Sequence, residues 1–453
     1  MGRLRHLAPG QALILYYAVA ILVGAAALSL PFASSGESLS FVDALFTATS
    51  AQCVTGLTVV DTGSGLSLFG QIVVLFLIQT GGLGITTFSV YLFFFLRLGV
   101  GTHGRWIINE TLLHTPVCSL RELIGGIIRL ALVMEAAGAV LLAGAFVPDL
   151  GLGRGLFSAV FHSVSAFCNA GFSLFADSLM GYRASPLVNL TVILLIVTGG
   201  IGFLVIRELR DILFRPVKGR RPKLSLHSRM VLWTTGILIV GGAVLIFLME
   251  YGGGFLGTGV GDKVLASLFQ SVTARTAGFN TVDMNALRIS TLLLMIFLMF
   301  VGASPGSAGG GIKTTSLALF VAIIRSRLKG NPHTNIFRRT IPDDAVTKAL
   351  ALVMLAVLTI GIALFGLLMV QHPGASARQH DAVFLQYLFE TVSAFGTVGL
   401  SMGATARLTV AGKLIIIALM FVGRVGLLTV AFTIARRLSP TAPRYAEENI
   451  MIG

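Results

Sequence analysis

Long apolar stretches separated by short polar connections run through the whole chain. Gly10–Leu30, Ile72–Leu96, Leu187–Ile206, Met230–Met249 and Leu350–Val370 each hold about 20 predominantly apolar residues, the length that a helix needs to cross a bilayer core. One such stretch could be a buried helix of a soluble protein. So many in one chain predict an integral membrane protein, and the full pattern predicts eight spanning helices.

A motif of Phe, three further residues, Ser or Thr, and Ala occurs four times between these stretches. The copies are Phe46–Ala51, Phe161–Ala166, Phe269–Ala274 and Phe389–Ala394. Each is followed, four or five residues after the Ala, by a glycine between small and apolar residues. These glycines are Gly56, Gly171, Gly278 and Gly399, at intervals of 115, 107 and 121 residues. Self-similarity at matching positions is the signature of a repeated structural unit.

Each repeat has the same predicted order: a spanning helix, a short re-entrant pore helix, a filter strand and a second spanning helix. The predicted boundaries are 1–110, 111–220, 221–340, with a broken second long helix, and 341–453, with a cytoplasmic C-terminus. Non-helical backbone at membrane depth survives only where it is buried or lines a watery cavity. The sequence therefore predicts an all-α membrane protein with four repeats around one central pore.

The four glycine strands carry the predicted chemistry of this pore. Rings of backbone carbonyls can replace the hydration shell of a potassium ion, and Thr397-Val398-Gly399-Leu400 is one step from the Thr-Val-Gly-Tyr filter of tetrameric potassium channels. The predicted filter residues, acting through backbone carbonyls, are Cys53, Val54, Thr55, Gly56, Cys168, Asn169, Ala170, Gly171, Arg275, Thr276, Ala277, Gly278, Gly396, Thr397, Val398 and Gly399.

Two further features of the sequence fall inside the membrane. The segment Gly302–Lys313 has six glycines or prolines in twelve positions and cannot be a regular helix. Ile289–Val301 before it is too short to cross the bilayer alone, so the break lies at membrane depth. Arg424, inside the last apolar stretch, is costly there unless it faces a cavity or a partner. It is either a functional charge or a structural Arg bonded to carbonyls.

Charge and composition change this picture in only two respects. The net charge is +14, but the Lys and Arg residues concentrate in alternate connections, and such a bias marks the cytoplasmic side. Both termini are therefore predicted to be cytoplasmic, and nucleic acid is not an expected partner. The cysteines Cys53, Cys118 and Cys168 have no metal-ligand spacing, and Glu135 alone offers no acid/base pair, so an enzyme is not expected.

At the four glycine strands, Gly302–Lys313 and Arg424, the chain resembles the Trk/Ktr/HKT superfamily of potassium transporters, most closely the KtrB-type membrane subunits of Ktr uptake systems. The resemblance covers essentially the whole chain. It implies that the broken segment is an intramembrane gate under the filter and that Arg424 lies beside it. The implied gate residues are Gly302, Ser304, Pro305, Gly306, Gly309, Gly310, Gly311, Lys313 and Arg424. A glycine at position 56, rather than the serine of sodium-selective plant relatives, favours potassium.

The resemblance also implies partners and a location. A chain of this kind sits in the plasma (inner) membrane among lipids, forms a homodimer and docks on a cytosolic KtrA-type ring that binds ATP or ADP. This chain itself would bind no cofactor; potassium is the transported ion, and sodium is a candidate activator. Arg215–Arg229 and Arg325–Arg339 are candidate contact surfaces for the ring, or simply the topology signal.

Two alternatives stay open at the level of sequence. One is a sodium-conducting or poorly selective member of the same superfamily. The other is a proton- or sodium-coupled transporter of an organic solute, since such transporters also use broken helices and repeats. Their repeats are usually two, and they lack a glycine filter.

Overall fold

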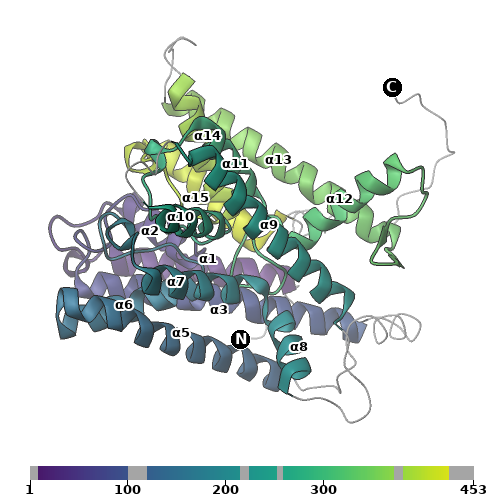
Figure 1. The fold of residues 1–453 in the computed structure, drawn as a ribbon. Coiled ribbons are helices and arrows are strands. Elements are labelled where there is room, and N and C mark those ends of the chain that lie inside the picture. The colour runs from purple at the N-terminus through teal and green to yellow at the C-terminus, as the bar shows by residue number, and fades with distance from the viewer. Residues whose placement is uncertain (1–8, 100–119, 215–223, 253–258, 372–380, 428–453) are drawn as a thin grey trace, which may run out of the picture.

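The protein is an almost entirely helical bundle, seen in a computed structural model that describes residues 9–99, 120–214, 224–252, 259–371 and 381–427 (Figure 1). The helices long and apolar enough to cross a bilayer are α1 (Pro9–Leu28), α3 (Leu68–Gly99), α5 (Leu120–Leu150), α9 (Leu226–Glu250) and α13 (Asp343–Gln371). A bent pair of helices, α7 (Pro186–Ile201) and α8 (Phe203–Phe214), is a sixth candidate. The chain is thus a multi-pass membrane protein. Cys118 and both chain termini lie outside the described residues.

The long helices expose apolar side chains on their outward faces. On α13, Met354, Ile362 and Phe365 are 71%, 64% and 65% exposed. A helix that is apolar all round suits a lipid environment, whereas the same surface in water would promote aggregation. The predicted stretches Met230–Met249 and Leu350–Val370 lie wholly within α9 and α13.

Four shorter helices lead into the glycine motifs. They are α2 (Phe41–Gln52), α6 (Leu152–Phe167), α10 (Val260–Thr273) and α14 (Asp381–Gly396). At 12 to 16 residues they are too short to cross a bilayer, as expected of re-entrant pore helices. The Phe of each motif copy is fully buried, as is the Ala, so the repeated motif forms the centre of the bundle.

Several of the remaining helices are broken beside glycines. A continuous helix over Leu187–Ile206 was expected, but α7 (Pro186–Ile201) and α8 (Phe203–Phe214) meet at an angle of 102°. Gly202 separates them with a φ of +98°, which a residue with a Cβ rarely adopts. The prediction of a straight helix there was therefore wrong.

The third and fourth repeats also contain short helices. Helix α11 (Ile289–Phe300) ends early and α12 (Thr314–Leu328) follows after a loop, while α15 (Val410–Val425) ends at Gly426, whose φ is +93°. Among the residues that the structure describes, length and apolarity alone therefore single out five or six spans rather than eight. The difference arises because glycines interrupt helices that the apolar pattern treats as continuous.

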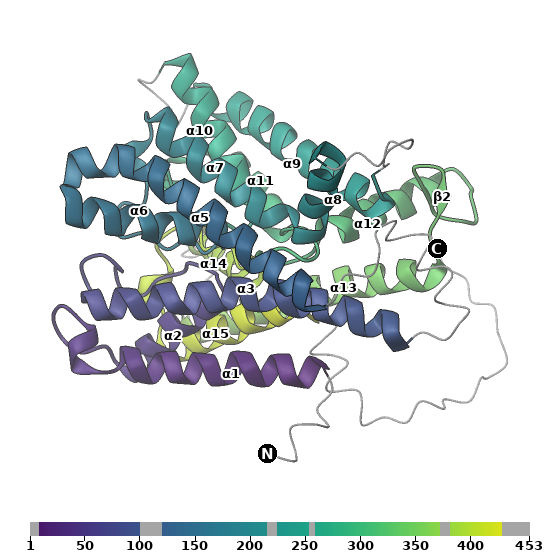
Figure 2. The same cartoon turned by 90° about the horizontal axis from the view of Figure 1, so that it is seen from below.

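Smaller elements complete the fold. They are η2 (Pro31–Ala33), η3 (Met180–Tyr182), η4 (Met284–Ala286), η6 (Thr405–Arg407) and the hairpin β1 (Asn335–Ile336) and β2 (Arg339–Thr340). The hairpin, α8 and α12 gather at one end of the bundle, and α6 reaches the opposite end (Figure 2). At the first of these ends, α12 carries Arg325 and Arg327, and α8 carries Arg207 and Arg210 beside Glu208 and Asp211.

Candidate functional site

Four glycine segments, defined as residues 53–56, 168–171, 275–278 and 396–399, meet in a closed ring at the ends of α2, α6, α10 and α14. A Cβ added to the last glycine of each segment would lie less than 3.0 Å from a carbonyl oxygen of the next segment. The pairs are Gly56 with Ala170, Gly171 with Ala277, Gly278 with Val398, and Gly399 with Thr55. The segments follow one another around the ring in chain order, and no side chain fits between them.

Each glycine segment contains two residues in the left-handed region of backbone space. One is the glycine itself, with φ between +70° and +93°. The other lies two positions earlier, and these residues are Val54 (φ 56°), Asn169 (φ 59°), Thr276 (φ 67°) and Thr397 (φ 50°). Such a conformation costs a non-glycine residue on the order of 1–3 kcal/mol and is typical of ligand-binding sites.

This conformation differs from the extended strand expected from the sequence. In an extended strand, successive carbonyl groups point to opposite sides. Here left-handed residues alternate with a residue of negative φ, and this alternation turns successive carbonyl groups toward the same side. The arrangement is suited to presenting stacked rings of oxygen atoms along one axis.

Hydroxyl groups of the short helices fix these segments. Ser50 Oγ accepts a hydrogen bond from Gly56 N, and Ser393 Oγ accepts one from Gly399 N, both at 3.1 Å. In the other two repeats the hydroxyl donates instead. These bonds, both 2.8 Å long, run from Ser165 to the carbonyl of Phe172 and from Thr273 to that of Phe279. The Ser or Thr of the repeated motif thus anchors every segment.

The loop of residues 301–313, here called the α11–α12 loop, packs against the break between α7 and α8. Ser304 N and Ala308 N donate to the carbonyls of Gly200 and Gly199 at 3.0 and 3.1 Å. In the other direction, Phe203 N donates to the Gly306 carbonyl at 3.1 Å. The break in α7 leaves backbone groups unpaired within its helix, and the loop pairs them.

The same loop lies against the ring of glycine segments. Gly310 N donates to Thr397 Oγ1 at 3.1 Å. A Cβ on Gly309 would lie less than 3.0 Å from the Thr276 side chain, and one on Gly310 less than 3.0 Å from that of Thr397. Only glycine allows the loop to approach the ring this closely. Lys313 donates from its ammonium back to the Gly309 carbonyl at 2.7 Å.

Arg424 holds this loop from α15. Its side chain is 3% exposed and has three neutral oxygen partners. The guanidinium donates to the carbonyl of Ala308 in the loop, to the Gly81 carbonyl in α3 (2.8 Å) and to the hydroxyl of Tyr17 in α1 (3.3 Å). Tyr17 also donates to Gly81, at 2.9 Å. One charged side chain therefore ties the loop to three helices.

The first residues of the first two glycine segments cap the short helices that precede them. Cys53 and Cys168 have helical backbone angles and end α2 and α6. Cys168 Sγ lies 3.7 Å from Gln79 Oε1 and 3.9 Å from Glu135 Oε1. Gln79 donates to both carboxyl oxygens of Glu135, at 3.1 and 3.0 Å. The buried carboxyl group of Glu135 therefore has a hydrogen-bond partner, the side-chain amide of Gln79.

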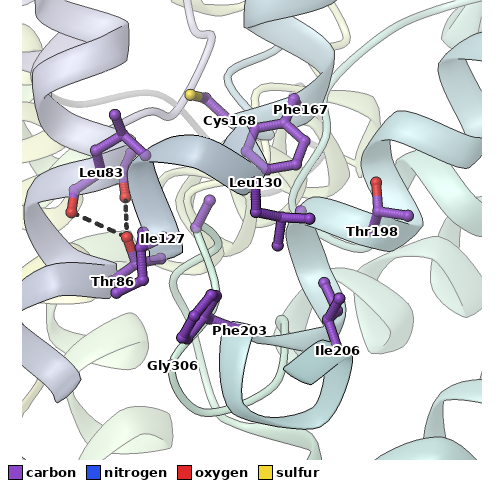
Figure 3. A pocket seen from close by; sticks show the side chains of 13 residues that line it. Leu83, Thr86, Ile127, Leu130, Phe167, Cys168, Thr198, Phe203, Ile206 and Gly306 are labelled. Atoms are coloured by element: carbon purple, nitrogen blue, oxygen red, sulfur yellow. Dashed lines mark hydrogen bonds between the residues drawn. The ribbon is translucent and has the colours of Figure 1, made fainter. Parts of the chain in front are cut away.

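A small cavity of about 30 Å³ lies beside these groups, large enough for a water molecule. Figure 3 shows Cys168 and Phe167 on one side of it and Phe203 and Gly306 on the other. The cavity borders both the second glycine segment and the α11–α12 loop. It therefore leaves space next to the loop that a small displacement could use.

The structure brings the predicted glycine segments, loop and Arg424 into one region. Sequence reasoning missed Tyr17, because a lone aromatic residue in an apolar helix carries no signal. It also missed a position in the short helices that carries His162, Gln270 or Glu390, all fully buried. The signal was present, because each of these residues directly follows the Phe of the repeated motif.

A ring of glycine backbone in a bundle of membrane-crossing helices defines a membrane transport protein. Residues 11–442 match the TrkH family, whose members are described as cation transport proteins. The chain is 41% identical to the Ktr system potassium uptake protein B of Bacillus subtilis, over 98% of this chain and 97% of that one. The chain belongs to the TrkH family, which confirms the resemblance seen in the sequence and the expectation that it is not an enzyme.

Two further relatives extend the comparison. The potassium/sodium uptake protein NtpJ of Enterococcus hirae is 38% identical over 99% of this chain and 98% of its own. The crystal structure of the potassium transporter TrkH from Vibrio parahaemolyticus superimposes with a TM-score of 0.73, over 96% of this chain and 86% of that one. At 21% identity, that likeness shows a shared fold.

Proposed function

We propose that this chain takes up potassium as the pore subunit of a Ktr-type complex in the plasma membrane. The observation that carries the proposal is the closed ring of four glycine segments, in which left-handed backbone turns carbonyl groups toward one axis. Carbonyl rings of this kind replace the hydration shell of potassium. The Bacillus subtilis relative, named as a Ktr potassium uptake protein, supports the choice of ion.

In this proposal the four repeats surround one central pore with eight spanning helices, and both chain termini are cytoplasmic. The repeats are 1–110, 111–220, 221–340 and 341–453. Helices α7, α11 and α15 complete the set of spans, although each is interrupted or ends beside a glycine. The basic residues of α8 and α12 at one end of the bundle support a cytoplasmic assignment for that end.

The α11–α12 loop is the proposed gate. It lies between the ring and the α7–α8 break, so an ion leaving the ring on that side would meet it. Every hydrogen bond that holds it is made by backbone, hydroxyl, Lys313 or Arg424 groups, and its small residues allow it to move without a bulky side chain entering the pore. Arg424 keeps the gate closed by binding the Ala308 carbonyl and by adding positive charge beside the path of a cation.

The assembly proposed for the chain is a homodimer on a cytosolic KtrA-type ring that binds ATP or ADP, with sodium as a candidate activator. The relatives named as Ktr system proteins support a multi-subunit system. Arg325–Arg339 covers the end of α12 and the β1–β2 hairpin, both at the same end of the bundle as α8, and is the proposed contact surface. Much of the other candidate segment, Arg215–Arg229, lies outside the described residues.

A second candidate function is conduction of both potassium and sodium. The observation that favours it is the similarity to NtpJ, which is named as a potassium/sodium uptake protein. The ring is also irregular, since its four segments differ in side chains and in how their hydroxyl anchors are used. Four unlike segments discriminate less strictly than four identical ones.

The test is cation flux into proteoliposomes that hold the purified protein, with potassium, sodium and choline compared. The matched variant is Gly56→Ser. Its Cβ would lie less than 3.0 Å from the Ala170 carbonyl, at a φ of +93° that favours glycine, so it should distort the ring and lower the preference for potassium. Flux favouring sodium in the parent protein would support the second candidate. No flux of either ion, with or without an added KtrA-type partner, would refute both.

A further inference from the structure

In three of the four repeats, one position in the short helix connects that helix to the loop that follows its glycine segment. The position directly follows the Phe of the repeated motif and carries Thr47, His162, Gln270 or Glu390. In three repeats its side chain hydrogen-bonds a hydroxyl eleven residues later. The three pairs are His162 with Ser173, Gln270 with Thr281, and Glu390 with Ser401.

The pairs differ in strength. Glu390 accepts from Ser401 Oγ, from Thr405 Oγ1 at 2.7 Å and from Ala404 N at 3.2 Å. Three donors on a fully buried carboxylate make this the firmest connection, because hydrogen bonds to charged groups are stronger than neutral ones. Ser401 in turn accepts from Gly403 N at 2.9 Å, which fixes the turn after the fourth segment.

The second connection is neutral. His162 Nδ1 lies 2.7 Å from the carbonyl of Ser158, which can only accept, so in a neutral ring Nε2 accepts from the Ser173 hydroxyl at 2.9 Å. Ser173 Oγ also accepts from Phe175 N at 3.0 Å. The ring of His162 is stacked on that of Phe175, with centroids 4.6 Å apart. The loop is therefore held by both polar and aromatic contacts.

The third connection is the weakest, and the first repeat differs from the others. Gln270 Nε2 reaches Thr281 Oγ1 at 3.3 Å, and its Oε1 has no hydrogen-bond partner among the described residues. In the first repeat, Thr47 Oγ1 donates to the Asp43 carbonyl of its own helix at 2.8 Å. Within the described part of the chain, no hydrogen bond joins Thr47 to Thr58, the residue eleven positions on.

We propose that His162, Gln270 and Glu390 are positioning residues. They hold the loops that follow the glycine segments and thereby set the preference of the ring for potassium over sodium. This inference rests on the proposed function. A filter discriminates between ions by its size and by the number and field strength of its carbonyls, both of which change when the backbone relaxes. The segments themselves are strained, so they depend on surrounding contacts to keep their shape.

The test removes the hydroxyl end of each connection and leaves the helix intact. The variants are Ser401→Ala, Ser173→Ala and Thr281→Val, with Thr58→Val as the matched control in the first repeat. The ratio of potassium to sodium flux should fall about threefold or more in Ser401→Ala, less in Ser173→Ala and least in Thr281→Val, following the strengths of the bonds. Thr58→Val should keep the parent ratio.

Two more variants separate positioning from a general effect on stability. Ser401→Thr keeps the hydroxyl and should keep the flux ratio. Glu390→Gln keeps the shape and should lower the ratio even where Ser401→Ala does not accumulate. A parent without any preference for potassium would remove the proposed function and this inference together. A selective parent whose variants all keep its ratio, or whose Thr58→Val variant loses it equally, would overturn this inference alone.

Discussion

Replacing Arg424 with Ala is expected to open the proposed gate. The guanidinium makes the contact that joins α15 to the α11–α12 loop, through the Ala308 carbonyl. Its other two bonds, to Gly81 and Tyr17, join helices to one another. Because Tyr17 also donates to the Gly81 carbonyl, that oxygen keeps a partner in the variant. All three oxygens lose their Arg424 donor in the variant, but only the Ala308 carbonyl among them belongs to the α11–α12 loop.

The size of the effect follows from this single bond. A hydrogen bond to a charged group contributes about 1.5–3 kcal/mol to the state that contains it. If the bond exists only while the loop is closed, its loss shifts the ratio of closed to open protein roughly ten- to 150-fold, since 1.36 kcal/mol corresponds to a factor of ten. Potassium flux without a regulatory partner should rise by the same factor while the open fraction is small.

The assay is initial potassium influx into proteoliposomes at matched protein content, with Arg424→Lys beside Arg424→Ala. Lysine keeps the positive charge but lacks the planar fork that reaches three oxygens at once. If the charge itself repels cations, Arg424→Lys should stay near the parent flux. If the hydrogen bonds hold the loop, Arg424→Lys should approach Arg424→Ala. Parent-like flux in a folded Arg424→Ala protein would refute the gating role of this residue altogether.

Two further predictions concern the loop and the closure of the ring. Gly310→Ala should raise basal potassium flux, because its Cβ would lie less than 3.0 Å from the Thr397 side chain. The control is Gly125→Ala, whose Cβ would meet nothing within 4 Å and which should keep the parent flux. Equal flux in the two variants would contradict the role of the loop as a gate. Lys413 and Asp43, an ion pair at 2.5 Å with side chains 15% and 23% exposed, join α15 to α2. A double-mutant cycle of Lys413→Met and Asp43→Asn on thermal unfolding should give a coupling of about 1–2 kcal/mol; zero coupling would mean that the pair does not hold the first and fourth repeats together.

The repeated parts of the site could be predicted from the sequence because they use the same residue types in every copy. Gly56 and its three counterparts must be glycine, since any Cβ would meet a neighbouring carbonyl. The break in the helix before Lys313 could be predicted equally well, because a segment so dense in glycine and proline does not form a regular helix. In both places the backbone conformation itself demands particular residues, so the sequence carries the information directly.

Other parts of the site could not be read in this way. The left-handed backbone at Val54 contradicts the preference of a β-branched residue, so only its surroundings can impose it. The bend after α7 was missed because Gly202 looks in the sequence like Gly199 and Gly200 just before it, whereas in the structure its φ of +98° sets it apart. Arg424 was recognised as a buried charge, but its three partners come from parts of the chain up to 407 residues away.

The connections made by His162, Gln270 and Glu390 explain why a position shared by the repeats can go unrecognised in the sequence. The position is the same in each copy, but an imidazole, an amide and a carboxylate all reach a hydroxyl at the same separation along the chain. These three repeats share a hydrogen bond to a hydroxyl eleven residues later rather than a residue type. Because the connections differ in strength from one repeat to the next, we expect the ring to be held unevenly and its first segment to depend most on its neighbours. A pore assembled from one chain can therefore tune each quarter of its filter separately, which four identical subunits cannot do.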